Sequence, residues 1–139
     1  MERQIKFRAW DMVAELMIYS DQQYGLYFFE FYDGELGCFY INEKSYSNSI
    51  DEPPEPHCDK LNNLMQFTGL HDKDGREIYE GDICENCDWE SGTNAYNYII
   101  EVVKYDEDTA SFYGWNYNRG GMSCKVIGNI FEHPELKEG

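Results

Sequence analysis

The sequence predicts a mainly β fold, a β-rich α+β fold at most, made of short antiparallel strands and hairpins. Aromatic residues make up 17% of the 139 residues, with twelve Tyr and eight Phe, and aromatic rings pack well across the pleated surface of a sheet. Short apolar runs alternate with turn-forming residues at near-regular spacing. The signal for α-helix is thin by comparison, so we expect strands joined by tight turns.

The first predicted strand has the period-2 pattern of a half-buried strand. Its two sets of side chains are Ile5, Phe7 and Ala9 on one face and Lys6, Arg8 and Trp10 on the other. We expect the first set to be buried and the two basic residues to be exposed. A polar connection at residues 11–15 leads to an apolar run at 16–19, which predicts an antiparallel hairpin.

A second hairpin is predicted from a dense aromatic run at residues 24–32, which Asp33-Gly34 separates from residues 36–41. Asp-Gly between two apolar runs is a strong signal for a two-residue hairpin turn.

The composition changes between residues 42 and 60, where Pro53, Pro54 and Pro56 occur. Proline removes backbone donors and favours extended chain, which predicts a connector. The spacing of Pro53 and Pro56 also fits a PxxP docking motif, although its flanks are acidic rather than basic. We therefore expect one compact unit with three parts: an N-terminal β-hairpin lobe at 1–50, a Pro-rich connector at 51–60 and a barrel-like lobe at 61–139.

The stretch from residue 64 to 83 organises the chain. An apolar run reaches Leu70, the Asp72-Lys73-Asp74-Gly75 segment predicts a turn, and a short strand then meets a second tight turn at Glu80-Gly81-Asp82. We expect a positive φ at Gly81, which a residue with a Cβ adopts reluctantly. Residues 83–87 leave this turn in extended form.

The remaining chain predicts more short strands. Apolar residues on both faces of residues 96–105 predict a central, covered strand, residues 111–115 return after a turn, and residues 122–131 close the series. This C-terminal half predicts a small SH3-like barrel or a strongly bent sheet. Residues 133–136 predict one terminal helical turn, since Pro suits a first helical position.

Three blocks carry a family resemblance. They are Ile-Lys-Phe-Arg-Ala-Trp-Asp at 5–11, the stretch at 64–83, and Val-Ile-Gly-Asn-Ile-Phe-Glu at 126–132. In this order they resemble the YopX family of bacteriophage and prophage proteins. Cys84 stands where we expect an aliphatic residue and Phe131 where we expect Tyr. The resemblance implies a phage or prophage origin and a mostly β fold, but no activity, because the function of the family is unknown.

The net charge of the chain limits the kinds of partner that it can bind. The formal net charge is −16 and the estimated pI is near 4.3, which keeps the protein in solution and disfavours direct binding to nucleic acid or anionic lipid. No apolar run approaches the roughly 20 residues of a membrane span, and the N-terminus lacks the apolar segment of a signal peptide. We expect a protein of the host cytosol, with its five Cys residues reduced.

Motifs for chemistry are weak. Cys84-Glu85-Asn86-Cys87 has the spacing of a zinc knuckle, but a structural site needs four ligands, and only unpatterned residues remain to complete it: His57, Cys58 and Cys124. The Asp72–Gly75 segment resembles the middle of a calcium loop, yet Leu70 and Gly81 occupy the positions where carboxylates are required. Two thiols along a strand and a pair of turn-forming aspartates are the simpler interpretations.

Catalytic patterns are equally weak. The three histidines, His57, His71 and His133, accompany no nucleophile elbow, and phosphate-loop and dinucleotide fingerprints are missing from the sequence. The arginines at positions 8, 76 and 119 are too scattered for a nucleic-acid patch. The sequence therefore predicts no catalytic, cofactor-binding or metal-binding residues.

Two classes of function remain. The first is a non-enzymatic protein-interaction module that binds a host or phage protein, or itself, through aromatic surface. The second is an enzyme that uses carboxylates or Cys84, and a further alternative is an acidic mimic of nucleic acid that binds a basic host protein. Because the aromatic run at 24–32 is too apolar to leave in water, we also expect a homo-oligomer.

Overall fold

The computed structural model describes residues 4–42, 57–90, 95–115, 117–118 and 121–138. The chain divides into two compact units. We call Lys6–Leu64 the N-terminal unit and Met65–Gly139, together with Met1–Ile5, the C-terminal unit. The strand pairs within each unit are antiparallel, and one sheet curls into half a barrel. The predicted mainly β fold is confirmed.

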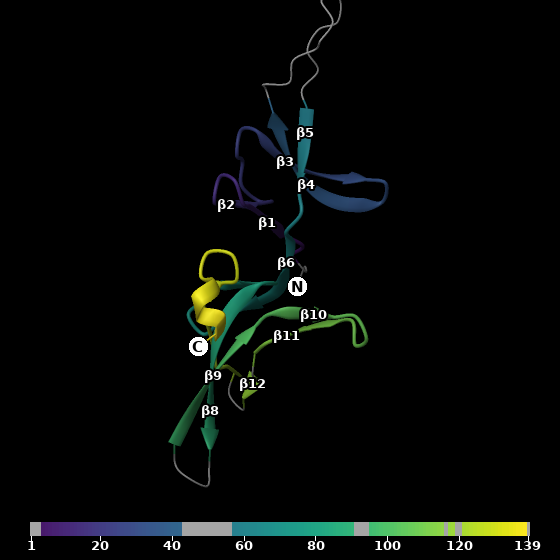
Figure 1. The fold of residues 1–139 in the computed structure, drawn as a ribbon. Coiled ribbons are helices and arrows are strands. Elements are labelled where there is room, and N and C mark those ends of the chain that lie inside the picture. Colours follow the sequence, from purple (N-terminus) through teal and green to yellow (C-terminus); the bar gives the residue numbers. More distant parts are fainter. Residues whose placement is uncertain (1–3, 43–56, 91–94, 116, 119–120, 139) are drawn as a thin grey trace, which may run out of the picture. The chain divides into compact units, whose positions relative to one another are not determined.

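The N-terminal unit contains a hairpin and a three-stranded sheet (Figure 1). The hairpin pairs β1 (Phe7–Asp11) with β2 (Leu16–Tyr19), and the sheet has the order β3 (Tyr27–Tyr32), β4 (Glu35–Asn42), β5 (His57–Leu61). Asp33 and Gly34 connect β3 to β4, and both have positive φ, at 52° and 81°. This two-residue turn is the one that Asp-Gly predicted.

The predicted facing of β1 is wrong. Ile5 is 66% exposed, whereas Arg8 is only 3% exposed and Phe7 is half-buried. Residues 8 to 11 are all buried, and since successive side chains of a strand point to opposite faces, both faces of β1 are covered. A strand covered on both sides does not separate its apolar and basic residues, so alternation could not identify a solvent face.

The aromatic run at 24–32 is largely folded into its own unit. Tyr24, Tyr27 and Phe29 pack against a core of Ala9, Ile18 and Cys38, while Phe31 and Tyr32 at the end of the hairpin are exposed. Residues 51–56 of the expected connector, with its three prolines, lie outside the described residues. From His57 the chain is already in β5, so the last part of the expected connector is a strand.

The C-terminal unit consists of short strands. They are β6 (Leu64–His71) with β7 (Glu77–Tyr79), a sheet in the order β14 (Cys124–Asn129), β8 (Asp82–Glu90), β9 (Ala95–Val102), a ribbon of β10 (Lys104–Asp106) and β11 (Ser111–Tyr113), and β12 (Tyr117–Asn118) with β13 (Gly121–Met122). The predicted helical turn is a 3-10 helix, η1 (Pro134–Glu138). No helix among the described residues is long and apolar enough to cross a membrane.

The expected central strand at 96–105 is instead an edge strand. In the sheet of the C-terminal unit β8 lies between β14 and β9, and Tyr98, Ile99 and Ile100 of β9 are 64%, 44% and 37% exposed. The strand also ends before Val103, and a separate strand, β10, begins after it. Apolar side chains on both faces of a segment therefore did not indicate which strand is covered.

The turn at Gly81 is as predicted. Its φ is +85°, its N–H donates to the carbonyl of Val103 (2.9 Å), and its carbonyl accepts from the N–H of Ile130 (3.0 Å). A Cβ here would lie 2.8 Å from the sulfur of Met65. The turn thus joins three separate segments of the C-terminal unit, and only glycine fits it without strain.

Candidate functional site

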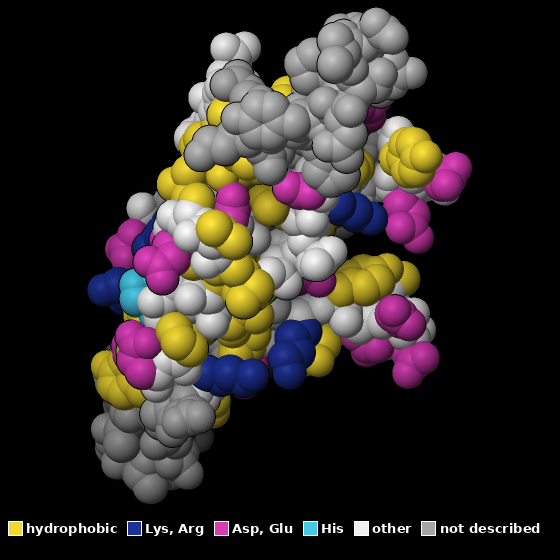
Figure 2. Space-filling model, turned by 45° about the horizontal axis from the view of Figure 1, so that its top comes forward, with side chains coloured by type: hydrophobic (Ala, Val, Ile, Leu, Met, Phe, Trp, Pro, Cys, Tyr) yellow, Lys and Arg dark blue, Asp and Glu magenta, His cyan; other side chains and the backbone are white. Residues whose placement is uncertain are grey.

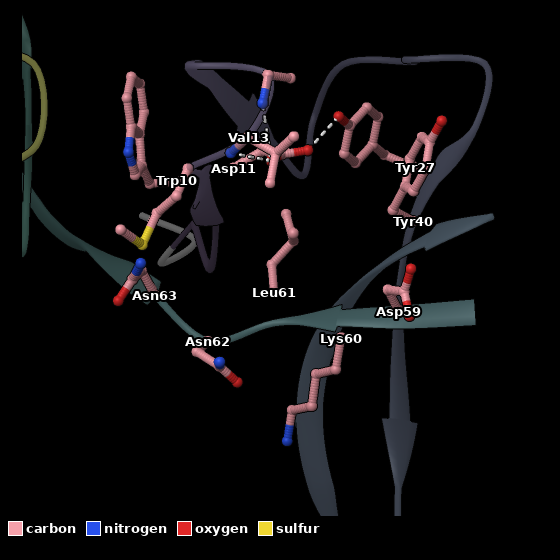
Figure 3. Close-up of a pocket in the computed structure, with 12 residues that line it drawn as sticks. Trp10, Asp11, Val13, Tyr27, Tyr40, Asp59, Lys60, Leu61, Asn62 and Asn63 are labelled. Carbon is pink, nitrogen blue, oxygen red and sulfur yellow. Dashed lines mark hydrogen bonds between the residues drawn. The ribbon is translucent and has the colours of Figure 1, made fainter. Parts of the chain in front are cut away.

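A hollow of about 520 Å³ opens in the N-terminal unit (Figure 3). It lies between the end of β1 with its following turn, one side of β3 and β4, and the end of β5. We call it the aromatic–acidic pocket, and its lining residues are Trp10, Asp11, Met12, Val13, Ala14, Tyr27, Tyr40, Asp59, Lys60, Leu61, Asn62 and Asn63. This volume is in the range of pockets that bind small molecules.

Strand register sets one wall of the pocket. Tyr27 of β3 is the cross-strand partner of Tyr40 of β4, and Tyr40 is the partner of Asp59 of β5. Directly opposite residues of antiparallel strands share a face, so the three side chains form one row. The two rings lie 5.1 Å apart between centroids, tilted by 46°. The row therefore presents two phenol rings with a carboxylate at one end.

Asp11 closes the other end of this row. One of its carboxylate oxygens accepts from the N–H groups of Val13 (2.9 Å) and Ala14 (3.1 Å), and the other accepts from the hydroxyl of Tyr27 (2.5 Å). The turn after β1 thus holds the carboxylate, and the carboxylate holds the Tyr27 ring, as Figure 3 shows. Asp11 itself is 7% exposed.

Hydrogen bonding decides the charge of this pair. Burial raises the pKa of Asp11, but the hydrogen bonds from Tyr27, Ala14 and Val13 outweigh it and leave the pKa below its ordinary value. Burial, followed by the hydrogen bond to Asp11 and its charge, raises the pKa of Tyr27. Near neutral pH Asp11 is therefore a carboxylate and Tyr27 a neutral donor.

The two charged residues of β5 diverge. Asp59 is exposed and lies on the Tyr40 side of the strand, whereas Lys60 points to the opposite side in Figure 3. The Lys60 ammonium lies 3.8 Å from a carboxylate oxygen of Glu35. Among the lining residues that the structure describes, the charges directed at the pocket are consequently those of the Asp11 and Asp59 carboxylates.

The cysteines considered as metal ligands do not all gather at one site. Cys84 and Cys124 lie together in the core of the C-terminal unit, where the hydrogen bond between the thiols and then burial raise the pKa of Cys84. Cys87 is three residues further along β8, which places it on the opposite face, and Cys58 is exposed in the N-terminal unit. Within the described ranges no three His, Cys, Asp or Glu side chains gather closely enough to hold a metal ion.

Asp72 is a turn-forming residue, as the simpler interpretation held. Its carboxylate accepts from three backbone N–H groups, those of Asp74 (2.9 Å), Arg76 (2.8 Å) and Val126 (2.9 Å). Burial raises its pKa, but these hydrogen bonds and the charge of Arg76 outweigh burial and lower it. The carboxylate ties the turn to β14, which begins at Cys124, much later in the chain.

Two of the three histidines considered as catalytic candidates have structural contacts. The ring of His71 packs edge-on against Phe67 at 5.7 Å, and Nδ1 of His133 accepts from the N–H of Asn129 at 3.3 Å. Arg8 is buried and Arg76 exposed, and Arg119 lies outside the described residues. His57 begins β5.

Sequence reasoning missed the pocket residues. Asp11, Tyr27, Tyr40 and Asp59 come from four different strands and share no spacing in the sequence. One signal was readable: an Asp at the end of a predicted strand, before a polar connection, is typical of a turn in which the side chain accepts backbone N–H groups.

Comparison with known proteins gives a family and a fold. The family model described as YopX protein matches residues 6–138. A crystal structure of protein EF1440 from Enterococcus faecalis is similar, with a TM-score of 0.53 and 24% identity over 97% of this chain and 99% of that chain. At this identity the likeness extends to the fold alone. No curated protein matches the chain.

Proposed function

The chain belongs to the YopX family, and on that premise we propose that it is a non-enzymatic module that binds another protein through the aromatic–acidic pocket. The observation that carries the proposal is the row of Tyr27, Tyr40 and Asp59, closed by Asp11. Tyrosine rings with a polar end are favoured in binding surfaces, and the strands and turn hold these groups before a partner arrives. The resemblance to phage and prophage proteins implies a host or phage protein as the partner.

The protonation states favour recognition over catalysis. A carboxylate pair for acid and base chemistry needs one member with a raised pKa, whereas the pKa of Asp11 is lowered. A nucleophilic cysteine needs a thiolate, whereas the pKa of buried Cys84 is raised. Both routes to the alternative enzyme are therefore less well supported.

Mimicry of nucleic acid also has less support. It requires carboxylates spaced along one face so that a basic partner meets a continuous negative surface. On the face drawn in Figure 2, Asp and Glu side chains are scattered among apolar and other side chains. Self-association, the other expected partnership, stays a prediction.

Affinity capture with matched baits tests the proposed function. The tagged chain, its Asp59→Asn and Tyr40→Ala variants and a Phe31→Ala control are exposed to lysate of an induced host, after circular dichroism has shown that each is folded. Phe31 is a suitable control because it is 69% exposed and does not line the pocket. We expect a protein that wild type and Phe31→Ala retain and both pocket variants lose. Partners that bind all four baits equally would contradict the proposal.

A further inference from the structure

We propose that the aromatic–acidic pocket receives a cationic side chain, an arginine or a lysine, with its charged group against the rings of Tyr27 and Tyr40 and between the carboxylates of Asp11 and Asp59. The inference rests on the proposed function only in assigning this cation to a protein partner. The pocket itself supplies the chemical reasons for a cation.

The rings provide the first reason. The face of a tyrosine ring attracts a cation within about 6 Å of its centroid. Two such rings stand side by side on β3 and β4, with centroids 5.1 Å apart and planes tilted by 46°, and both line the pocket, so a planar guanidinium in the pocket can meet a ring face. Leu61 lies on the same side of β5 as Asp59 and points into the hollow in Figure 3, where it offers contact to the aliphatic stem of an entering side chain.

The carboxylates provide the second reason. Asp11 is held by three donors, so its charge is in place before a ligand arrives and needs little reorganisation. Asp59 is exposed on the same face, where it can meet a ligand that still carries water. Lys60, the basic residue among the described lining residues, points away from the pocket. An anionic ligand would meet repulsion here, and a neutral ligand could donate hydrogen bonds to the carboxylates but would gain no attraction between opposite charges.

Arginine fits this arrangement better than lysine. A guanidinium has five donors in a planar fork and stacks on aromatic faces, whereas an ammonium is a compact, strongly hydrated charge. The net charge of −16 also attracts basic segments at long range, an effect that salt screens.

Small probes test the inference without a known partner. N-acetyl-arginine amide, the corresponding lysine amide and the neutral isostere N-acetyl-citrulline amide are titrated into the full chain, and binding is followed by shifts of backbone amide signals in NMR spectra. We expect the arginine probe to shift signals of the turn after β1 and of β5, and the citrulline probe to bind about tenfold more weakly or not at all. Raising the salt concentration should weaken the binding of arginine.

Variants of the pocket, with a control outside it, test whether the arginine probe binds at Asp59 and Tyr40. Asp59→Asn should weaken binding of the arginine probe about fivefold, and Tyr40→Leu by a similar or larger factor. Asp33→Asn removes the same charge from an exposed turn of the same unit, at a residue whose φ of 52° asparagine tolerates, and it should change binding less than twofold. Equal binding of citrulline and arginine, or equal weakening by Asp33→Asn and Asp59→Asn, would overturn the inference.

The two proposals fail separately. Arginine binding in the pocket without any captured protein that depends on it would leave the cation site and remove the proposed function. The opposite result is also possible: a protein is captured only when Tyr40 and Asp59 are intact, but the probes do not distinguish arginine from citrulline. That result would support the proposed function and remove the cation site.

Discussion

Asp11 in the N-terminal unit and Asp72 in the C-terminal unit both accept hydrogen bonds from a turn that follows them, but they have different structural roles. Each is buried, each accepts two backbone N–H groups of its own turn, and each has a lowered pKa. The third donor differs. For Asp72 it is the buried N–H of Val126, 54 residues away, and for Asp11 it is the hydroxyl of Tyr27 in the wall of a pocket. The Asp72 carboxylate connects its turn to β14, and the Asp11 carboxylate orients the ring of Tyr27.

The C-terminal unit uses its other buried polar side chains in the same connecting role. Asp82 accepts from the N–H of Tyr79, Asn86 donates to the carbonyl of Gly114, and Asn129 accepts from two N–H groups of the chain that follows it. These hydrogen bonds satisfy buried polar groups within the unit, which stabilises its fold. The third partner of each carboxylate, rather than its lowered pKa, therefore distinguishes the one that lines the pocket from the one that ties β14 to a turn.

The largest expected effect comes from removing the carboxylate of Asp72, and the comparison is with removal of the carboxylate of Asp11. Asp72→Ala should lower the free energy of unfolding by about 3–5 kcal/mol, because it leaves a buried N–H of β14 and two turn donors without an acceptor. Asp11→Ala should cost about 1–2 kcal/mol, because the donors of Val13 and Ala14 lie in an exposed turn and can bind water. Urea denaturation measures both.

Asp74→Ala is the control for this pair. Asp74 is exposed in the same turn as Asp72, so its loss should cost about 0.5 kcal/mol or less. If Asp11→Ala proves as costly as Asp72→Ala, the division into a connecting and an orienting carboxylate is wrong.

Two glycines of the C-terminal unit give the next largest effect. Gly81→Ala should cost about 2–4 kcal/mol, because it adds a clash with the sulfur of Met65 to the strain of a φ of +85°. Gly75→Ala should cost only about 1–2 kcal/mol, since φ is +86° but no atom lies within 4 Å of the added Cβ. Thermal or chemical unfolding compares them, and a Gly81 variant with an unchanged midpoint would refute the turn argument.

The last expected effect concerns the ionisation of the buried Cys38 thiol. Burial and then the charge of Asp11 raise the pKa of this thiol from 9.0 to about 11. The thiol therefore ionises in the unfolded chain before it does so in the folded one. Its contribution to stability is present below pH 9 and is lost as the pH rises from 9 to 11.

The measurement is the free energy of unfolding between pH 8 and 11. It should fall more steeply for wild type than for Cys38→Ala, while the control Cys58→Ala, at an exposed thiol, should follow wild type. Parallel curves for wild type and Cys38→Ala would mean that the environment of Cys38 is not the one described.

The sequence by itself determined the local geometry of this protein. The Asp33-Gly34 turn, the Asp72 turn, the positive φ of Gly81 and the hairpins around them follow from what a few neighbouring residues can adopt. Steric limits on φ and the reach of a short Asp side chain act within four or five residues, so they can be read along the chain.

Only the tertiary structure decided which surfaces are covered and which side chains meet. Arg8 is buried and β9 is an edge strand because of which strands lie beside them, and a strand does not encode its neighbours in its own alternation. The row of Tyr27, Tyr40 and Asp59 depends on the register of three strands, and its closure by Asp11 depends on a fourth. Burial and cross-strand contact are properties of several segments at once, which is why the pocket could not be predicted from any one of them.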